Sequence, residues 1–81
     1  MAIEDLRKKI DSMDDKILGM IEERVDLAKR IGIVKRKKNL PIEDADREGE
    51  VLARMARKTR LKKDFVRKIF EDIISYCREV Q

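Results

Sequence analysis

Two cationic side chains stand on what the sequence predicts to be a buried helix face. On a helix with 3.6 residues per turn and Ile3 set at 0°, the apolar positions form a stripe centred at about 315°. Arg24 lies at about 300° and Lys35 at about 320°, while Arg7 lies at the edge of the stripe, at about 40°. Because an unpaired buried cation is unfavourable, these residues need an anionic partner. That partner is a carboxylate of another helix or an anionic ligand, unless the lysine stem reaches back to solvent.

Polar residues also interrupt the apolar faces of two further predicted helices. Glu48 lies in line with Leu52, either as the partner of one of those cations or as a capping-box residue. Cys77 is central on the apolar face of the third predicted helix, where it could be a small core residue. Gln81 lies one turn further on, where it could belong to a frayed helix end. Together they predict a cation-rich cavity with apolar walls, which suits a small anion with several carboxylates and a hydroxyl.

Three helices are predicted to position these residues. The first covers about residues 3–38 and ends at the segment 39–41, because Asn favours a helix C-terminus and Pro stops a helix. Asp44 or Asp46 is a plausible N-cap for the second helix. The third covers about residues 62–80. Since no stretch alternates between apolar and polar residues as a strand would, the sequence indicates an all-α domain spanning residues 1–81.

The first helix is too long for one small chain to cover. Roughly 36 residues at 1.5 Å each extend about 50 Å, whereas a compact globule of this size has a radius of gyration of about 12 Å. The two other helices are each about half as long. We therefore expect a second copy to cover the rest of the stripe, giving an intertwined helical homodimer. The alternative is a monomeric bundle in which the first helix breaks near Gly19.

Composition narrows the class of protein further. The chain of 81 residues has no His and one Cys, which excludes His-based acid–base chemistry, His metal sites and an internal disulfide. No uncharged run exceeds five residues, so we expect no membrane span and no signal peptide, and hence a cytoplasmic protein. Charged residues make up 47% of the chain and only Asn39 and Gln81 carry side-chain amides, a composition typical of a thermophilic source. The net charge of +4 favours an anionic partner.

The order and spacing of these residues resemble those of the all-helical (AroQ-type) chorismate mutases over essentially the whole chain. The motifs are Leu6-Arg7-Lys8-Lys9-Ile10-Asp11 with Asp14, Glu23-Arg24 before Leu27-Ala28, Lys35, Pro41-Ile42 before Asp44, Asp46-Arg47-Glu48, Ile69-Phe70, Ile73-Ile74, Cys77 and Gln81. The resemblance implies an intertwined homodimer with two active sites. It also implies the rearrangement of chorismate to prephenate, on the route to Phe and Tyr.

Roles for individual residues also follow from the resemblance. It implies that Arg24 holds one substrate carboxylate and that Arg7 reaches the other carboxylate from the partner subunit. Family members often have Ser or Asn where Cys77 stands, and a thiol is the weaker hydrogen-bond donor. Binding of a carboxylate at that position is therefore expected to be looser in this chain.

The remaining roles concern the ether oxygen and the ring hydroxyl. The resemblance implies that Lys35 and Gln81 hydrogen-bond the ether oxygen, and that Glu48 and the backbone at Asp44 hold the ring hydroxyl. Arg47 is expected to support the site. One C–O bond breaks while one C–C bond forms, so the reaction requires no nucleophile, metal or proton shuttle, and we expect no cofactor. A cation at the ether oxygen would stabilise the transition state more than the ground state.

Three other functions stay open on the sequence. An isochorismate pyruvate-lyase would use a similar fold and a similar Lys and Arg set. A helical dimer that binds nucleic acid could use the basic clusters in 35–38 and 57–63, but few aromatics are present for stacking, so we expect no nucleic-acid partner. A purely structural dimer is disfavoured by the inward charges, because apolar residues usually serve such an interface better.

Overall fold

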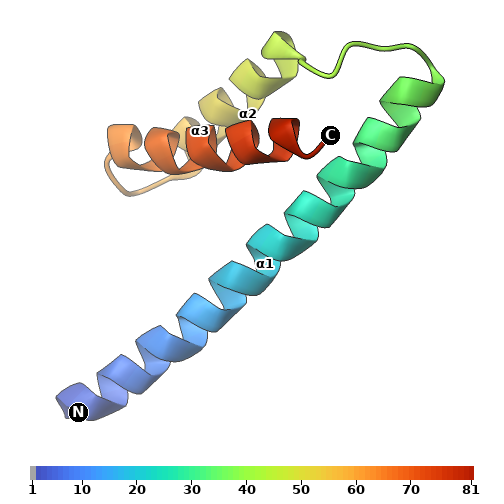
Figure 1. The fold of residues 1–81 in the computed structure, drawn as a ribbon. Coiled ribbons are helices and arrows are strands. Elements are labelled where there is room, and N and C mark those ends of the chain that lie inside the picture. Colours follow the sequence, from blue (N-terminus) through green and yellow to red (C-terminus); the bar gives the residue numbers. More distant parts are fainter. Residues whose placement is uncertain (1) are drawn as a thin grey trace.

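The computed structural model describes residues 2–81, which fold into three helices with no strand among them (Figure 1). Helix α1 spans Ile3–Lys37, α2 spans Ala45–Lys58 and α3 spans Lys63–Glu79. These bounds confirm the all-α prediction. The 35 residues of α1 continue through Gly19 without a break, so the alternative of a first helix that folds back there is wrong. None of the described helices is both long and apolar enough to cross a membrane.

The chain turns sharply after α1, at the segment predicted to end it. Asn39 has a φ of 55°, in the left-handed region that Asn tolerates. The N–H of Leu40 donates to the carbonyl of Lys35 at 2.8 Å, and the N–H of Asn39 donates to the carbonyl of Arg36 at 3.3 Å. These two bonds form a Schellman motif, which closes the helix just before Pro41. The motif fixes where the loop to α2 departs, directly beside Lys35.

Helix α2 begins with a side-chain cap. The carboxylate of Asp44 accepts a hydrogen bond from the backbone N–H of Arg47 at 3.0 Å, so Asp44 is the N-cap and Asp46 is not. Counted from this cap, Arg47 occupies the third helical position and Glu48 the fourth. The interpretation of Glu48 as a capping-box residue is therefore wrong, and its carboxylate needs another explanation.

Helix α3 joins the three helices into one unit, because it packs against both α1 and α2 (Figure 1). The small core comprises Ala28, Val51, Val66, Ile74 and Cys77. The N-terminal half of α1 extends away from α2 and α3, and the whole molecule measures 55 × 24 × 15 Å. Along this half the apolar stripe is between 46% and 65% exposed at Ile3, Leu6, Ile10, Met13, Ile17 and Met20. Within residues 2–81 of one chain, no other element covers this stripe.

Two glycines of α1 differ in what surrounds them. A Cβ on Gly32 would lie 2.8 Å from both the Cα and the main-chain oxygen of Gln81, so only glycine fits without moving the backbone there. A Cβ on Gly19 would meet nothing within 4 Å in this chain. Gly32 is therefore the place where α1 receives the end of the chain after α3.

Candidate active site

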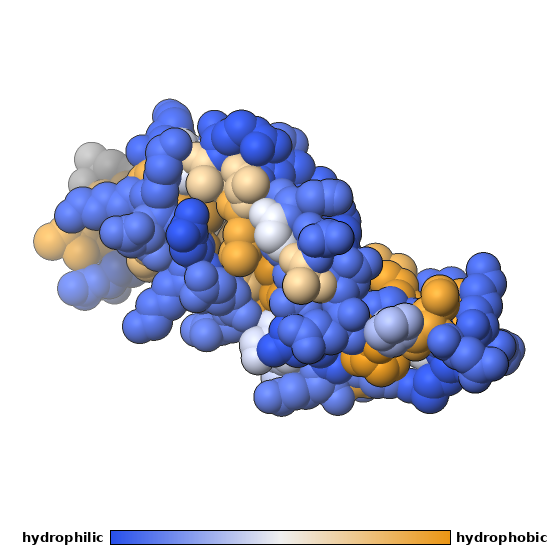
Figure 2. All heavy atoms as spheres, turned by 90° about the horizontal axis from the view of Figure 1, so that it is seen from above, coloured by the Kyte–Doolittle hydropathy of each residue, from blue (hydrophilic) through white to orange (hydrophobic). Residues whose placement is uncertain are grey.

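A cavity of about 430 Å³ lies between the three helices. All three helices contribute to its wall, as does the loop before α2. Seven of the eight site residues predicted from the sequence line it, namely Arg24, Lys35, Asp44, Arg47, Glu48, Cys77 and Gln81. Apolar side chains, among them Ile31 and Val51, complete the wall. Seen from above, apolar residues form a strip flanked by hydrophilic ones (Figure 2). The prediction of a polar cavity with apolar walls is confirmed.

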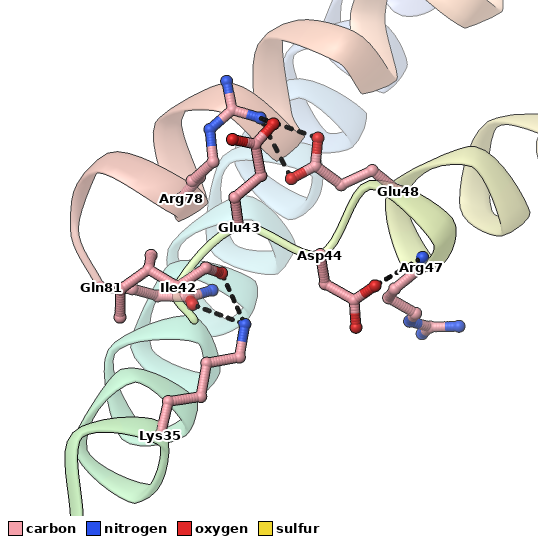
Figure 3. Close-up of polar contacts among 8 residues, drawn as sticks. All are labelled: Lys35, Ile42, Glu43, Asp44, Arg47, Glu48, Arg78 and Gln81. Atoms are coloured by element: carbon pink, nitrogen blue, oxygen red, sulfur yellow. Dashed lines mark hydrogen bonds and ion pairs between the residues drawn. The ribbon is translucent and has the colours of Figure 1, made fainter. Parts of the chain in front are cut away.

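Lys35 is held from two sides at one end of the cavity (Figure 3). Its Nζ donates to the carbonyl of Ile42 at 2.7 Å and to Oε1 of Gln81 at 3.1 Å. An ammonium group has three hydrogens, so these two bonds leave one donor. The bond to Oε1 also engages the amide oxygen of Gln81 and leaves its NH₂ group as a donor. The pair thus combines a fixed positive charge with two hydrogen-bond donors.

Gln81 is positioned by its backbone as well as by its side chain. Its main chain lies against Gly32, its N–H donates to the carbonyl of Arg78 at 3.2 Å, and the guanidinium of Arg36 donates to its main-chain oxygen. The structure therefore places Gln81 in the wall of the cavity rather than in a frayed helix end.

Arg24 and Cys77 meet at a deeper point of the wall. Nη1 of Arg24 donates to the sulfur of Cys77 at 3.0 Å, and Cys77 is only 3% exposed. Cys77 therefore belongs both to the small core and to the cavity. The guanidinium has five N–H donors, and its bond to sulfur leaves others for an anionic ligand.

Glu48 has a partner that sequence reasoning missed. Both carboxylate oxygens accept from Nη1 of Arg78, at 2.7 and 3.0 Å, and Oε1 of Glu43 lies 3.9 Å from the same nitrogen (Figure 3). The predicted partners, Arg24 or Lys35, are therefore wrong. The spacing of Arg78 could have revealed it, because Arg78 follows Ile74 by four residues and so shares the side of α3 that lines the cavity.

The other predicted residues lie nearer to solvent. The carboxylate of Asp44 is engaged in capping α2, and the exposed guanidinium of Arg47 lies 3.9 Å from Oε1 of Glu50. Arg7 does not reach the cavity of its own chain. It lies in the protruding half of α1, where it is exposed and bonded to Glu4 at 3.3 Å. Seventeen residues separate it from Arg24, about 25 Å along the helix axis.

The charges of the cavity favour an anion. Four cationic side chains and two carboxylates line it, and one of the carboxylates is already paired with Arg78. The fold and this site define an all-helical protein that can bind a small polar anion.

Comparison with known proteins identifies the family. The chain matches chorismate mutase type II over residues 6–81. It is 32% identical over 80 residues to the chorismate mutase of Methanocaldococcus jannaschii, covering 95% of this chain and 81% of that protein. It is 36% identical over 85 residues to a bifunctional chorismate mutase/prephenate dehydratase from Aquifex aeolicus, covering 98% of this chain. The chain spans about a quarter of that bifunctional relative, 24% of its length.

Solved structures agree with this assignment. The structure of chorismate mutase (form I) from Thermus thermophilus has a TM-score of 0.88 and 31% sequence identity, covering 93% of this chain and 96% of that one. A conserved hypothetical protein from Pyrococcus furiosus has a TM-score of 0.82 and 38% sequence identity, and the match covers 96% of this chain and 92% of that one. The chain belongs to the chorismate mutase type II family, as its sequence motifs predicted.

Proposed function

We propose that this chain is a cytoplasmic chorismate mutase, which acts as a homodimer and converts chorismate to prephenate in the biosynthesis of Phe and Tyr. Membership of the chorismate mutase type II family supports this activity. The observation that carries it is the convergence of Arg24, Lys35, Glu48 and Gln81, from three different helices or their ends, on one cavity.

The first task of the site is to hold a flexible substrate in a compact conformation. A side chain of chorismate must fold over its ring before the new C–C bond can form, and fixing that geometry removes an entropic barrier. Arg24 supplies N–H donors for one substrate carboxylate, and Arg7 of the partner subunit supplies donors for the other. Two arginines suit this task because a guanidinium can bind a carboxylate through two parallel hydrogen bonds.

The second task is to stabilise the charge that develops on the ether oxygen as the C–O bond breaks. The third hydrogen of Lys35 and the NH₂ group of Gln81 are the donors for this oxygen. Their contacts with each other and with Ile42 fix them before the reaction starts. Donors that need no reorganisation stabilise the transition state more than the ground state, and removing one such donor typically costs about 2.7–4 kcal/mol.

The third task is recognition of the ring hydroxyl. The carboxylate of Glu48 accepts the hydroxyl hydrogen, and the backbone at Asp44 completes this end of the site. Arg47, three residues into the helix that Asp44 caps, supports the same wall. A hydroxyl contact of this kind is present in both the ground state and the transition state. It therefore contributes mainly to substrate binding.

A second copy of the chain completes the site. The uncovered stripe on the N-terminal half of α1 gives a dimer partner the apolar surface it needs. Arg7 lies on that same half, too far along a straight helix to reach the cavity of its own chain. In an antiparallel pairing of two α1 helices, Arg7 of one chain approaches Arg24 of the other. Each site would then take one arginine from each subunit.

The test is turnover by the purified chain. We expect loss of chorismate absorbance, with prephenate as the product and with no effect of EDTA. Isochorismate is tested in parallel, because release of pyruvate from it would indicate the lyase of similar fold. Failure to consume chorismate, or activity that EDTA abolishes and added metal restores, would refute the proposal.

A further inference from the structure

Arg78 is the one cation of the cavity wall to which the proposed mechanism gives no role. The other three cations have roles there, because Arg24 binds a substrate carboxylate, Lys35 binds the ether oxygen and Arg47 supports the wall near Asp44. Arg78 instead directs one nitrogen at both oxygens of Glu48, across the contact between α3 and α2. This contact places it next to the group that is proposed to bind the ring hydroxyl.

The pair differs from the surface ion pairs of the chain in its shielding. The side chains of Arg78 and Glu48 are 36% and 24% exposed, whereas those of Arg47 and Glu50 are 59% and 65% exposed. The distance from Nη1 to Oε1 is also shorter, at 2.7 Å between Arg78 and Glu48 and 3.9 Å between Arg47 and Glu50. A short, charge-assisted bond between partly shielded groups restricts their rotamers, which a long exposed ion pair does not. Glu43, at 3.9 Å and 67% exposed, is the weaker neighbour.

We propose that Arg78 is a positioning residue, which holds the carboxylate of Glu48 in the orientation that accepts the substrate's ring hydroxyl. This inference rests on the proposed function. An ionised carboxylate has about four acceptor positions, so the contacts with Arg78 leave room for one hydroxyl donor. Arg78 also offsets the negative charge of Glu48 beside a substrate that carries two carboxylates. Without Arg78, that carboxylate would turn freely and would repel the substrate.

Steady-state kinetics with chorismate test this role. Because a hydroxyl contact contributes to ground-state and transition-state binding alike, Arg78→Met is expected to raise KM at least tenfold and to change kcat less than threefold. Arg78→Lys, which keeps the charge without the planar guanidinium, should recover part of that loss. The matched control is Arg67→Met, an exposed arginine three turns earlier on the same helix, with KM expected within twofold of wild type.

A double-mutant cycle separates positioning from direct contact. If Arg78 acts through Glu48, then Arg78→Met in a Glu48→Gln background should raise KM less than threefold further. A substrate analogue that lacks the ring hydroxyl should likewise bind wild type and Arg78→Met almost equally. Equal losses in both backgrounds would overturn the proposal and would place Arg78 on the substrate itself. An unchanged KM in Arg78→Met would overturn it as well.

Failure of the proposed function would be distinguishable from failure of this inference. If wild type consumed no chorismate, the activity would be refuted. Urea unfolding of wild type, Arg78→Met, Glu48→Gln and the double variant would then test the contact separately. We then expect Arg78→Met to shift the unfolding midpoint less than half as far in the Glu48→Gln background as in wild type. Additive shifts would show that the two side chains do not hold each other, and would overturn the assignment.

Discussion

Replacing Gly32 with alanine tests how the end of the chain is held in the site. The added Cβ would lie 2.8 Å from the Cα and the main-chain oxygen of Gln81, and ordinary contact begins at 3.4 Å. Gln81 must therefore retreat by at least about 0.6 Å, the difference between those two distances. Backbone cannot rotate away as a long side chain can, so the bond from Lys35 to Oε1 of Gln81, now 3.1 Å, would be stretched or lost.

The magnitude follows from two opposing effects. Alanine is favoured over glycine in a helix by about 1 kcal/mol, whereas overpacking a close contact costs about 1–3 kcal/mol. The net change in the free energy of unfolding should then be a loss of about 0–2 kcal/mol. The effect on catalysis is expected to be larger, because a misplacement of about 1 Å can cost 10²-fold. We therefore expect kcat of Gly32→Ala to fall ten- to a hundredfold in a folded protein.

The assay combines steady-state kinetics with urea unfolding, and Gly49→Ala is the matched control. A Cβ on Gly49 would meet nothing within 4 Å, so this variant should gain up to about 1 kcal/mol from helix propensity with unchanged kcat. If Gly32→Ala behaved in the same way, more stable and fully active, then the contact between Gly32 and Gln81 does not position the amide.

Three further substitutions probe the cavity, each measured as kcat and KM with circular dichroism to verify folding. Lys35→Ala should lower kcat at least a hundredfold, because its charge acts chiefly in the transition state, and a change confined to KM would contradict that role. Glu48→Gln should be milder, since an amide oxygen still accepts from a hydroxyl. Cys77→Ser should be tolerated or should lower KM, because a hydroxyl is the stronger donor beside Arg24. A large loss of activity with an intact fold would contradict this and would show that the thiol itself is required.

Much of the fold could be predicted because its signals are local. The helical spacing of apolar residues predicts α1, and Asn39 and Pro41 predict where it ends. The same spacing places Arg24 and Lys35 on the face of α1 that lines the cavity. The inward position of Glu48 could be inferred in the same way. Each of these inferences needs only residues that are near one another in the chain.

The partners could not be predicted, because they depend on how helices distant in sequence pack together. Glu48 pairs with Arg78, thirty residues away, and a helix wheel cannot say which of several cations will be nearest. The same holds for the support of Gln81, which comes from Gly32 and Arg36 on the opposite helix. Nothing in the sequence distinguishes Gly32 from Gly19. They differ only in packing, because Gly32 lies against Gln81, whereas a Cβ on Gly19 would meet nothing within 4 Å in this chain.

Complementation between two inactive variants tests the shared site most directly. Arg7→Ala and Arg24→Ala homodimers should each be nearly inactive, since each lacks one arginine in both of its sites. When equal amounts are unfolded, mixed and refolded, about half of the dimers should be mixed by simple pairing statistics. Each mixed dimer then has one site with both arginines and one site with neither. The mixture should recover about a quarter of wild-type activity, whereas a mixture as inactive as its parents, with heterodimers verified by mass spectrometry, would contradict the shared site.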